Sequence, residues 1–334
     1  MRTRQIRAGG LTHRLLEAGE GPLVLLIHGF PELAISWRAQ ICALSEAGYR
    51  VVAPDMRGYG GTDKPDRRED YSILHLVGDM VELVRALDET ECVVVGHDWG
   101  APVAWHCALM RPDLFRAVAG LSVPFQPRRS NWPPTVAMAA ISTRAGLGEL
   151  YISQFQADDS HQMFEVDVES ALRKAFYAYD GSTPDGRQST GFVSTGQNFL
   201  STIPDDANLP PWMNEEHLAE YVAAFAAGGL KGPIDWYRCL DLNWALTAFL
   251  QGKQITQPSF FLVGERDPVR HYSGSHEAGL KDWLTDLRAQ IVLPGAGHWV
   301  QQERAGDVNA ALLDFLEGLA VVDQGVPPSP TNIC

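Results

Sequence analysis

Short runs of apolar residues, each ending close to a glycine, recur in the first third of the chain. Three of them are PLVLLIHGF (22–30), YRVVAPDMRG (49–58) and ECVVVGHDWG (91–100). Unbroken Val, Ile and Leu runs of this length are typical of parallel strands that are buried on both faces. Residues 72–89 carry apolar side chains every three or four positions, which predicts an amphipathic helix. This alternation predicts βαβ units in a mostly parallel, doubly wound α/β sheet.

The strand pattern continues in residues 115–125 and then stops. The next stretch, residues 127–250, is rich in proline, serine, aspartate and aromatic residues, and it contains helix-like segments but few strand candidates. Residues 258–267 and 289–299 restore the strand pattern, and residues 305–319 have the apolar spacing of a closing helix. The order of these segments predicts one α/β domain that is interrupted by a mainly helical insertion.

The domain boundaries are predicted from these changes in pattern. Residues 1–126 and 251–320 form the two parts of the α/β core, and residues 127–250 form a helical cap. The last residues, 321–334, are rich in proline and polar residues, so we expect a disordered tail there.

The charge balance narrows the range of partners. The 334 residues include 41 acidic and 27 basic side chains, which gives a formal net charge of −14. A field of this sign repels nucleic acid and anionic membrane surfaces, so we expect neither as a partner.

The cysteines and the N-terminal residues indicate a cellular compartment. The five cysteines are scattered and include no C-x-x-C pair, which indicates reduced thiols rather than disulfides or a zinc site. The first residues lack the apolar segment of a signal peptide, and no stretch reaches the roughly 18 apolar residues of a membrane span. We therefore expect a soluble, cytoplasmic protein.

An aspartate, Asp98, lies at the centre of a turn flanked by glycines. The sequence Gly96-His97-Asp98-Trp99-Gly100 has the Gly-x-Asp-x-Gly spacing of a tight turn between a strand and a helix. Such a turn lifts its central side chain out of the carboxyl edge of the sheet, where backbone N–H groups at the helix start point toward a bound group. An aspartate here could also be an ordinary N-cap, because carboxylates are common at helix starts.

Two later loops favour a catalytic role for this aspartate. Asp267 follows the strand that ends at Gly264, and His298 lies in the glycine-rich loop after the last predicted strand. Nucleophile, acid and histidine follow one another in this order in one catalytic arrangement on parallel sheets. Glu265 competes for the acid position, but the shorter side chain further along the loop is better placed to reach a histidine. Each could be an ordinary loop residue, yet the agreement of three loops favours a catalytic set.

The loop HGFPE (28–32) is expected to complete the site with an oxyanion hole. Its donors would be the backbone N–H groups of Phe30 and Trp99. Pro31 restricts the backbone next to Phe30, and the peptide bond between these two residues is a candidate for the cis form. His28 is interpreted as a structural hydrogen-bonding residue behind the site.

A carboxylate nucleophile suits displacement at a saturated carbon, which gives an alkyl ester of the enzyme. The carboxylate is already ionised at neutral pH, so the histidine is free to activate water for hydrolysis of that ester. Epoxide opening and haloalkane dehalogenation both fit this division of labour. They differ in the leaving group, because an epoxide oxygen leaves as a basic alkoxide that needs a proton, and a tyrosine hydroxyl can supply one.

No cofactor is indicated. The segment RGYGGTDKP (57–65) is glycine-rich but lacks the G-x-G-x-x-G spacing of a dinucleotide site. The sequence also contains no H-E-x-x-H motif, EF-hand loop or P-loop lysine, so we expect neither a cofactor nor a metal ion.

Several of these segments together resemble the α/β-hydrolase-fold epoxide hydrolases, in particular bacterial enzymes similar to soluble epoxide hydrolase, from about residue 20 to residue 318. HGFPE resembles the family motif H-G-x-P, GHDWG its nucleophile turn, and ERDP and GAGHWVQQE its acid and histidine loops. The resemblance implies an α/β-hydrolase fold whose helical cap is inserted after the sixth strand.

The resemblance also implies two proton donors in the cap. The family uses two tyrosines, which match Tyr151 in ELYISQF and Tyr237 in GPIDWYRCLDLNW. The second match has the more similar context, because Gln154 stands where the first motif commonly has an aromatic residue. Other cap tyrosines are interpreted as packing residues and serve as the fallback; these are Tyr177, Tyr179 and Tyr221.

Two other classes remain alternatives. In haloalkane dehalogenases the tryptophan after the aspartate also binds halide, so Trp99 does not discriminate between the families. Those relatives usually carry a second halide-binding residue where this chain has Phe30, and fluoroacetate dehalogenases place an arginine where it has Trp99. The other alternative is a non-catalytic receptor, because folds are reused for binding.

The sequence therefore predicts an epoxide hydrolase that forms a vicinal diol through an ester of Asp98. The expected substrate is a small apolar epoxide, which reacts with water. A tunnel between cap and core would bind it. The residues expected to line that tunnel are Phe30, Pro31, Trp99, Phe155 and Trp299. The sequence does not predict which epoxide is used, its regiochemistry or enantioselectivity, or the oligomeric state, for which a homodimer is one option.

Overall fold

An eight-stranded sheet forms the centre of the computed structural model, which describes residues 1–128, 131–146, 148–194 and 196–323. The strand order is β1-β2-β4-β3-β5-β6-β9-β10. The strands from β4 to β10 in this order run parallel, whereas β2 pairs antiparallel with both β1 and β4. The strands are β1 (Arg2–Ala8), β2 (Leu11–Ala18), β3 (Leu23–Ile27), β4 (Arg50–Pro54), β5 (Cys92–His97), β6 (Phe115–Leu121), β9 (Ile255–Gly264) and β10 (Leu284–Leu293).

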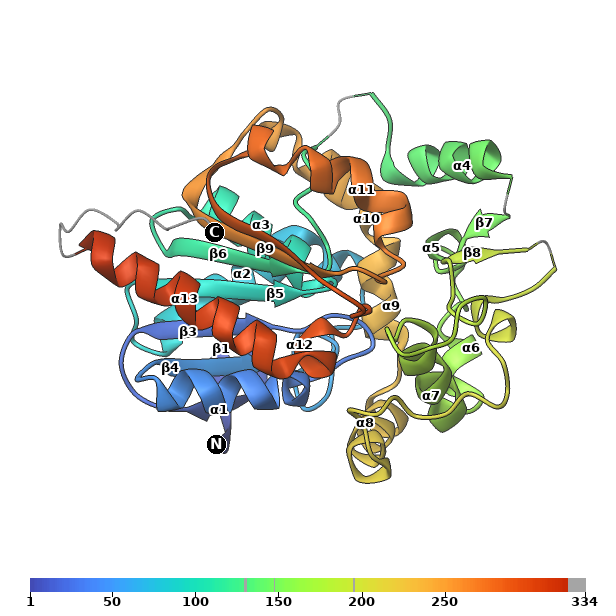
Figure 1. Cartoon of the computed structure of the whole chain (residues 1–334), viewed down its shortest axis with the longest axis horizontal. Coiled ribbons are helices and arrows are strands. Elements are labelled where there is room, and N and C mark those ends of the chain that lie inside the picture. Colours follow the sequence, from blue (N-terminus) through green and yellow to red (C-terminus); the bar gives the residue numbers. More distant parts are fainter. Residues whose placement is uncertain (129–130, 147, 195, 324–334) are drawn as a thin grey trace.

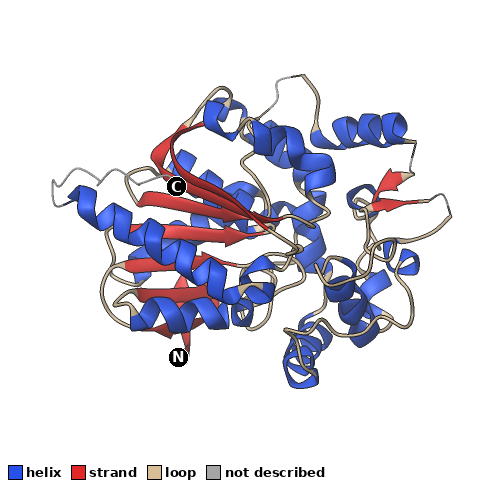
Figure 2. Cartoon of the chain, in the orientation of Figure 1, coloured by secondary structure: helices blue, strands red, loops and turns tan. Residues whose placement is uncertain are grey.

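Helices cover both faces of this sheet. On β3, Val24 and Leu26 pack into one apolar cluster, while Leu25 and Ile27 pack into another on the opposite face. This two-sided burial explains why the central strands read as continuous apolar runs. The covering helices are α1 (Arg38–Glu46) and α13 (Ala305–Asp323) on one face, and α2 (Ile73–Ala86) and α3 (Gly100–Met110) on the other (Figures 1 and 2).

The first two strands were not expected from the apolar pattern. Strand β1 lies at the edge of the sheet and exposes most of its side chains, so the charged sequence RTRQIRA contains no apolar run. Gly9 and Gly10 join β1 to β2 with positive φ angles of 59° and 85°. Two consecutive positive φ angles are typical of the tight turn in a β-hairpin, and glycine adopts them without steric cost.

Some observed boundaries differ from the predicted ones. Strand β6 ends at Leu121 rather than residue 125, and β10 begins at Leu284, before residue 289. Helix α13 continues through Asp323, so residues 321–323 of the predicted tail belong to it. The rest of that tail, residues 324–334, lies outside the described residues.

A mainly helical insertion connects β6 to β9 and lies beyond the carboxyl ends of the strands (Figure 1). It contains a two-stranded antiparallel sheet, whose strands are too short to produce a strand pattern in the sequence. Its elements are α4 (Pro134–Ala145), β7 (Glu149–Leu150), α5 (Tyr151–Gln154), α6 (Gln162–Glu165), α7 (Val168–Ala178), β8 (Phe192–Val193), η3 (Phe199–Thr202), α8 (Glu215–Gly228), α9 (Lys231–Arg238), α10 (Leu240–Leu246) and η4 (Ala248–Leu250). The short core elements are η1 (Ala34–Trp37), η2 (Arg68–Tyr71), α11 (Arg270–Ala278), η5 (Leu280–Asp282) and α12 (Val300–Glu303).

Candidate active site

Asp98 stands in a sharp turn between β5 and α3. Its φ angle is 51°, a left-handed conformation that is uncommon for a residue other than glycine. The flanking glycines make the turn possible, because a Cβ on Gly96 would lie 2.1 Å from the carbonyl oxygen of Gly100, and a Cβ on Gly100 would lie 2.0 Å from that of Ile27. The spacing of the two glycines therefore reflects a close approach of backbones that no other residue type permits.

The carboxylate of Asp98 is buried and has two polar neighbours. Oδ1 accepts a hydrogen bond of 2.7 Å from the N–H of Phe30, and Oδ2 lies 3.3 Å from Nε2 of His298. Burial alone would raise the pKa of the Asp98 carboxyl, but the hydrogen bond and charge of His298 and the Phe30 N–H hold that pKa below its ordinary value. Asp98 is therefore ionised at neutral pH and available as a nucleophile.

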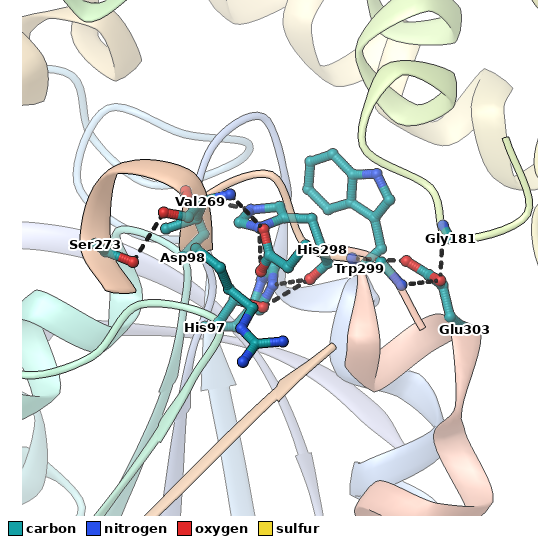
Figure 3. A network of polar contacts seen from close by, with 12 residues as sticks. His97, Asp98, Gly181, Val269, Ser273, His298, Trp299 and Glu303 are labelled. Carbon is teal, nitrogen blue, oxygen red and sulfur yellow. Dashed lines mark hydrogen bonds and ion pairs between the residues drawn. The ribbon is translucent and has the colours of Figure 1, made fainter. Parts of the chain in front are cut away.

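The imidazole of His298 lies between two carboxylates (Figure 3). Its Nδ1 is 3.1 Å and 3.0 Å from the two carboxylate oxygens of Asp267, which also accepts a hydrogen bond from the N–H of Val269. Burial would lower the pKa of His298, but the charge and hydrogen bond of Asp267, together with those of Asp98, raise it well above its ordinary value. Glu265 is directed elsewhere and accepts a hydrogen bond from Gly295 N–H at 2.9 Å.

A polar network behind the site holds the backbone of His298. The His298 carbonyl oxygen accepts hydrogen bonds of 2.8 Å from His97 Nε2 and from Ser122 Oγ. His97 Nδ1 lies 2.8 Å from Glu32, whose carboxylate also accepts a hydrogen bond from Gln301. Sequence reasoning missed these positioning residues, although His97 adjoins Asp98 and Glu32 closes the HGFPE segment.

His28 has the structural role that the sequence analysis expected. Its Nε2 accepts a hydrogen bond of 3.0 Å from Met56 N–H, so Nδ1 carries the proton that bonds to the carbonyl oxygen of Gly29. Burial lowers the pKa of His28, which favours this neutral form. The peptide bond between Phe30 and Pro31 is cis.

The two predicted cap tyrosines lie together above Asp98. Tyr151 begins α5 and Tyr237 lies on α9, and their ring centroids are 6.3 Å apart. Burial raises the pKa of both phenols. The charge of Asp98 raises the pKa of Tyr151 further, and the neighbouring Tyr151 raises the pKa of Tyr237 further. Both hydroxyls therefore keep their protons at neutral pH. A third tyrosine, Tyr272 on α11, lies near Tyr151, and no sequence motif pointed to it.

A narrow cavity connects these groups. Its free volume is about 30 Å³, enough for a water molecule, so aromatic side chains must move apart to admit an epoxide. Trp99 does not line it; that ring packs edge-on against Tyr237 and Trp236. Trp99 is the residue before α3, so its N–H lies at the helix start. The cavity is lined by Phe30, Pro31, Asp98, Tyr151, Phe155, Ala175, Tyr179, Phe199, Tyr237, Val269, His298 and Trp299.

The fallback tyrosines occupy different environments. Tyr179 lines the cavity, with its ring centroid 5.7 Å from that of His298. Tyr177 lies under the guanidinium of Arg187, and Tyr221 packs against Phe176. A wider surface groove of about 530 Å³ runs beside α7 and contains none of the predicted site residues.

Comparison with known proteins assigns the chain to a family. A family model described as alpha/beta hydrolase fold matches residues 22–305. The chain therefore belongs to the α/β-hydrolase fold family, as the turn at Asp98 and the sheet order indicate.

Relatives narrow this assignment. Epoxide hydrolase A of Mycobacterium tuberculosis is 42% identical over 322 residues, which cover 95% of this chain and 97% of that protein. Epoxide hydrolase 3 of Siraitia grosvenorii is 37% identical over 317 residues, 93% and 96% of the two chains. A solved structure of an epoxide hydrolase from an endophytic Streptomyces superposes with a TM-score of 0.91 at 40% identity and covers 96% of both chains. Within the α/β-hydrolase fold, the chain belongs to the epoxide hydrolases, which confirms the predicted family and enzyme class.

Among the residues that the structure describes, no helix is both long and apolar enough to cross a membrane. The same residues contain no group of three or more histidine, cysteine, aspartate or glutamate side chains arranged to hold a metal ion.

Proposed function

We propose that the protein converts a small apolar epoxide to a vicinal diol through a covalent ester of Asp98. The observation that supports this most strongly is the pairing of opposite chemical groups across one cavity. An ionised carboxylate with a depressed pKa lies on the core side, and two protonated phenols lie on the cap side. The aromatic rings in the lining favour an apolar substrate.

In the first step, the carboxylate of Asp98 attacks a ring carbon of the epoxide. The carbon–oxygen bond of the ring breaks, and its electron pair passes to the epoxide oxygen. Tyr151 or Tyr237 gives its proton to that oxygen, so a hydroxyl forms instead of a free alkoxide. The Phe30 N–H bond at 2.7 Å holds the carboxylate in place for this attack.

In the second step, His298 removes a proton from a water molecule that attacks the carbonyl carbon of the ester. Asp267 orients the imidazole and stabilises its positive charge, because it faces Nδ1 at 3.0 Å. The N–H groups of Phe30 and Trp99 would stabilise the tetrahedral oxyanion. When this intermediate collapses, the ester carbon–oxygen bond breaks and the departing diol oxygen takes the proton held by His298. The proton of the new Asp98 carboxyl returns to the tyrosine that gave one up, so the diol leaves with Asp98, His298 and the phenol restored.

An assay of both reactions tests the proposal against the dehalogenase alternative. Styrene oxide and a bromoalkane are supplied to the same preparation, and diol and bromide are measured side by side. We expect diol formation without bromide release. Bromide release without diol would reverse the assignment, and turnover of neither compound across an epoxide panel would favour a binding role.

Removal of the phenol hydroxyls should slow the first step. We expect Tyr151→Phe and Tyr237→Phe each to lower the rate of ester formation by about 10- to 100-fold, and the double variant by about 10³-fold or more. The reason is that the alkoxide then leaves without a proton donor. Stopped-flow tryptophan fluorescence follows this rate. Tyr221→Phe is the matched control, because Tyr221 is a buried cap tyrosine that packs against Phe176; an equal loss in the control would contradict the assignment.

The second step should depend on pH through His298. Two carboxylates raise the pKa of His298 in the free enzyme, and esterification of Asp98 removes one of those charges. Its pKa in the ester intermediate is therefore lower than in the free enzyme. Only the neutral imidazole accepts a proton, so ester decay should accelerate as pH rises through the pKa of His298 in the ester intermediate and then level off. Single-turnover decay measured at a series of pH values checks the sign, and a decay that slows with rising pH would contradict it.

A further inference from the structure

A carboxylate outside the catalytic set binds the histidine loop and the cap at the same time. Glu303 is the last residue of α12, five positions after His298. Its Oε2 accepts hydrogen bonds from Gly297 N–H at 2.7 Å and from Gly181 N–H at 3.0 Å, and its Oε1 accepts one from Trp299 N–H at 2.9 Å (Figure 3). Two of these donors flank His298 directly, and the third belongs to the cap.

The cap and the histidine loop touch backbone to backbone at this point. A Cβ on Gly181 would lie 2.4 Å from the carbonyl oxygen of Gly295, and a Cβ on Gly297 would lie 2.3 Å from the nitrogen of Gly181. The N–H of His298 also donates a hydrogen bond of 2.8 Å to the carbonyl oxygen of Tyr179. The position of the imidazole is therefore tied to the position of this cap segment. Glu303 is one of the side chains that join the loop to the cap; Trp299, whose Nε1 donates a hydrogen bond of 2.9 Å to the carbonyl oxygen of Phe176, is another.

We propose that Glu303 is a positioning residue for the hydrolytic step: it holds the backbone on both sides of His298 against the cap and so places the imidazole for water activation. It does not line the cavity. The inference rests on the proposed two-step mechanism, in which His298 acts as a base in the second step only.

The groups of the first step are held by other contacts. Phe30 N–H and the turn at α3 fix Asp98. Helix α9, which carries Tyr237, is anchored to the core by a hydrogen bond of 3.1 Å from Trp236 Nε1 to the carbonyl oxygen of Arg57. Loss of the Glu303 bonds should therefore affect ester hydrolysis more than ester formation.

The site requires a carboxylate rather than an amide. Both oxygens of Glu303 accept hydrogen bonds from N–H groups, so the amide of a glutamine would point two N–H donors at another N–H, whichever way it is turned. Burial and the charge of Asp180 raise the pKa of Glu303 to about 7, and the three N–H donors oppose that rise. Measurements at about pH 8.5 therefore examine the ionised form.

The test measures the two steps separately in E303Q. Enzyme is mixed with styrene oxide at about pH 8.5 and quenched in acid, and intact-protein mass spectrometry follows formation and decay of the ester. We expect the decay rate to fall about 10-fold or more while the formation rate stays within about threefold, so that the ester accumulates during turnover.

A matched control is available in the same loop region. Glu265 also accepts a backbone hydrogen bond, from Gly295 N–H, but it is exposed and contacts neither the cap nor the residues beside His298. We expect E265Q to leave both rates within about twofold of the original. If E303Q does not fold, E303D carries the test, because it keeps the charge but cannot reach all three donors; the same division between the two rates is expected.

The outcomes separate this inference from the proposed function. Equal losses in both steps of E303Q, or no loss in either, would overturn the positioning role while leaving the mechanism intact. Absence of any ester in the unaltered enzyme during diol formation would overturn the proposed mechanism, and the inference with it, before any variant is compared.

Discussion

Replacement of Asp98 by alanine is expected to lower diol formation by at least about 10⁴-fold and to abolish ester formation. Asp98 supplies the only bond that the proposed mechanism makes to the substrate in its first step. The Phe30 N–H and the two phenols remain in the variant, but they have no nucleophile to assist. Product formation measured by chromatography, together with intact-protein mass after an acid quench, gives both quantities.

The control for this variant is Asp113→Ala. Asp113 is an exposed aspartate that pairs with Arg111 on the surface, so its removal should leave turnover within about twofold. A thermal unfolding scan establishes that Asp98→Ala folds. Diol formation by the folded variant at more than about one per cent of the original rate would show that the carboxylate is not the nucleophile.

Replacement of His298 by glutamine is expected to stop turnover after one ester has formed. Asp98 is ionised without a base, so ester formation continues, although loss of the imidazole charge slows it modestly. Water is no longer activated, and kcat should fall by about 10³-fold. Mixing the variant with excess epoxide should convert nearly all of the protein to a species heavier by the mass of one epoxide.

His75→Gln controls for the loss of a histidine at a remote site. His75 is exposed on α2, where it contacts Ser72, and we expect normal turnover without accumulation of the ester. If His298→Gln forms no ester at all while it remains folded, His298 is required before the first bond forms. That result would contradict the division of labour between Asp98 and His298.

The meeting of Asp98, Asp267 and His298, the proposed catalytic set, was predictable because each of them follows a strand with a strong local signal. Asp98 stands between two glycines after β5, and Asp267 and His298 follow β9 and β10. Parallel strands bring their carboxyl ends to one edge of the sheet, so chain order alone was enough to expect these loops to meet. The choice of Asp267 over Glu265 depended on side-chain length, and the observed contacts agree with it.

The groups that sequence reasoning missed depend on contacts between distant segments. Tyr272 lies near Tyr151 although the two are far apart in the sequence, and Glu303 accepts a hydrogen bond from Gly181 across 122 positions. No local pattern encodes such a distance. For Trp99 the sequence predicted the position of the backbone but not the direction of the side chain. The turn at Asp98 fixes where the Trp99 backbone lies, but the Trp99 ring packs against Trp236 and does not line the cavity.

Strand β1 was not predicted from the apolar pattern, for a different reason. It is an edge strand with exposed charged side chains, so its pairing depends on backbone hydrogen bonds and on the glycine turn rather than on an apolar face. Strand β10 begins earlier than predicted. Its exposed and partly buried residues alternate, so it lacks the continuous apolar run that marks the fully buried β5.

The most direct measurement of the central claim is the fate of oxygen in a single turnover. Enzyme in excess over styrene oxide is allowed to react once in water enriched in heavy oxygen, and the diol and the peptide containing Asp98 are analysed by mass spectrometry. The ester mechanism predicts one heavy oxygen in the Asp98 carboxylate and an unlabelled diol, because water attacks the carbonyl carbon of the ester. A labelled diol with an unlabelled Asp98 would mean that water attacks the epoxide directly, which contradicts the account.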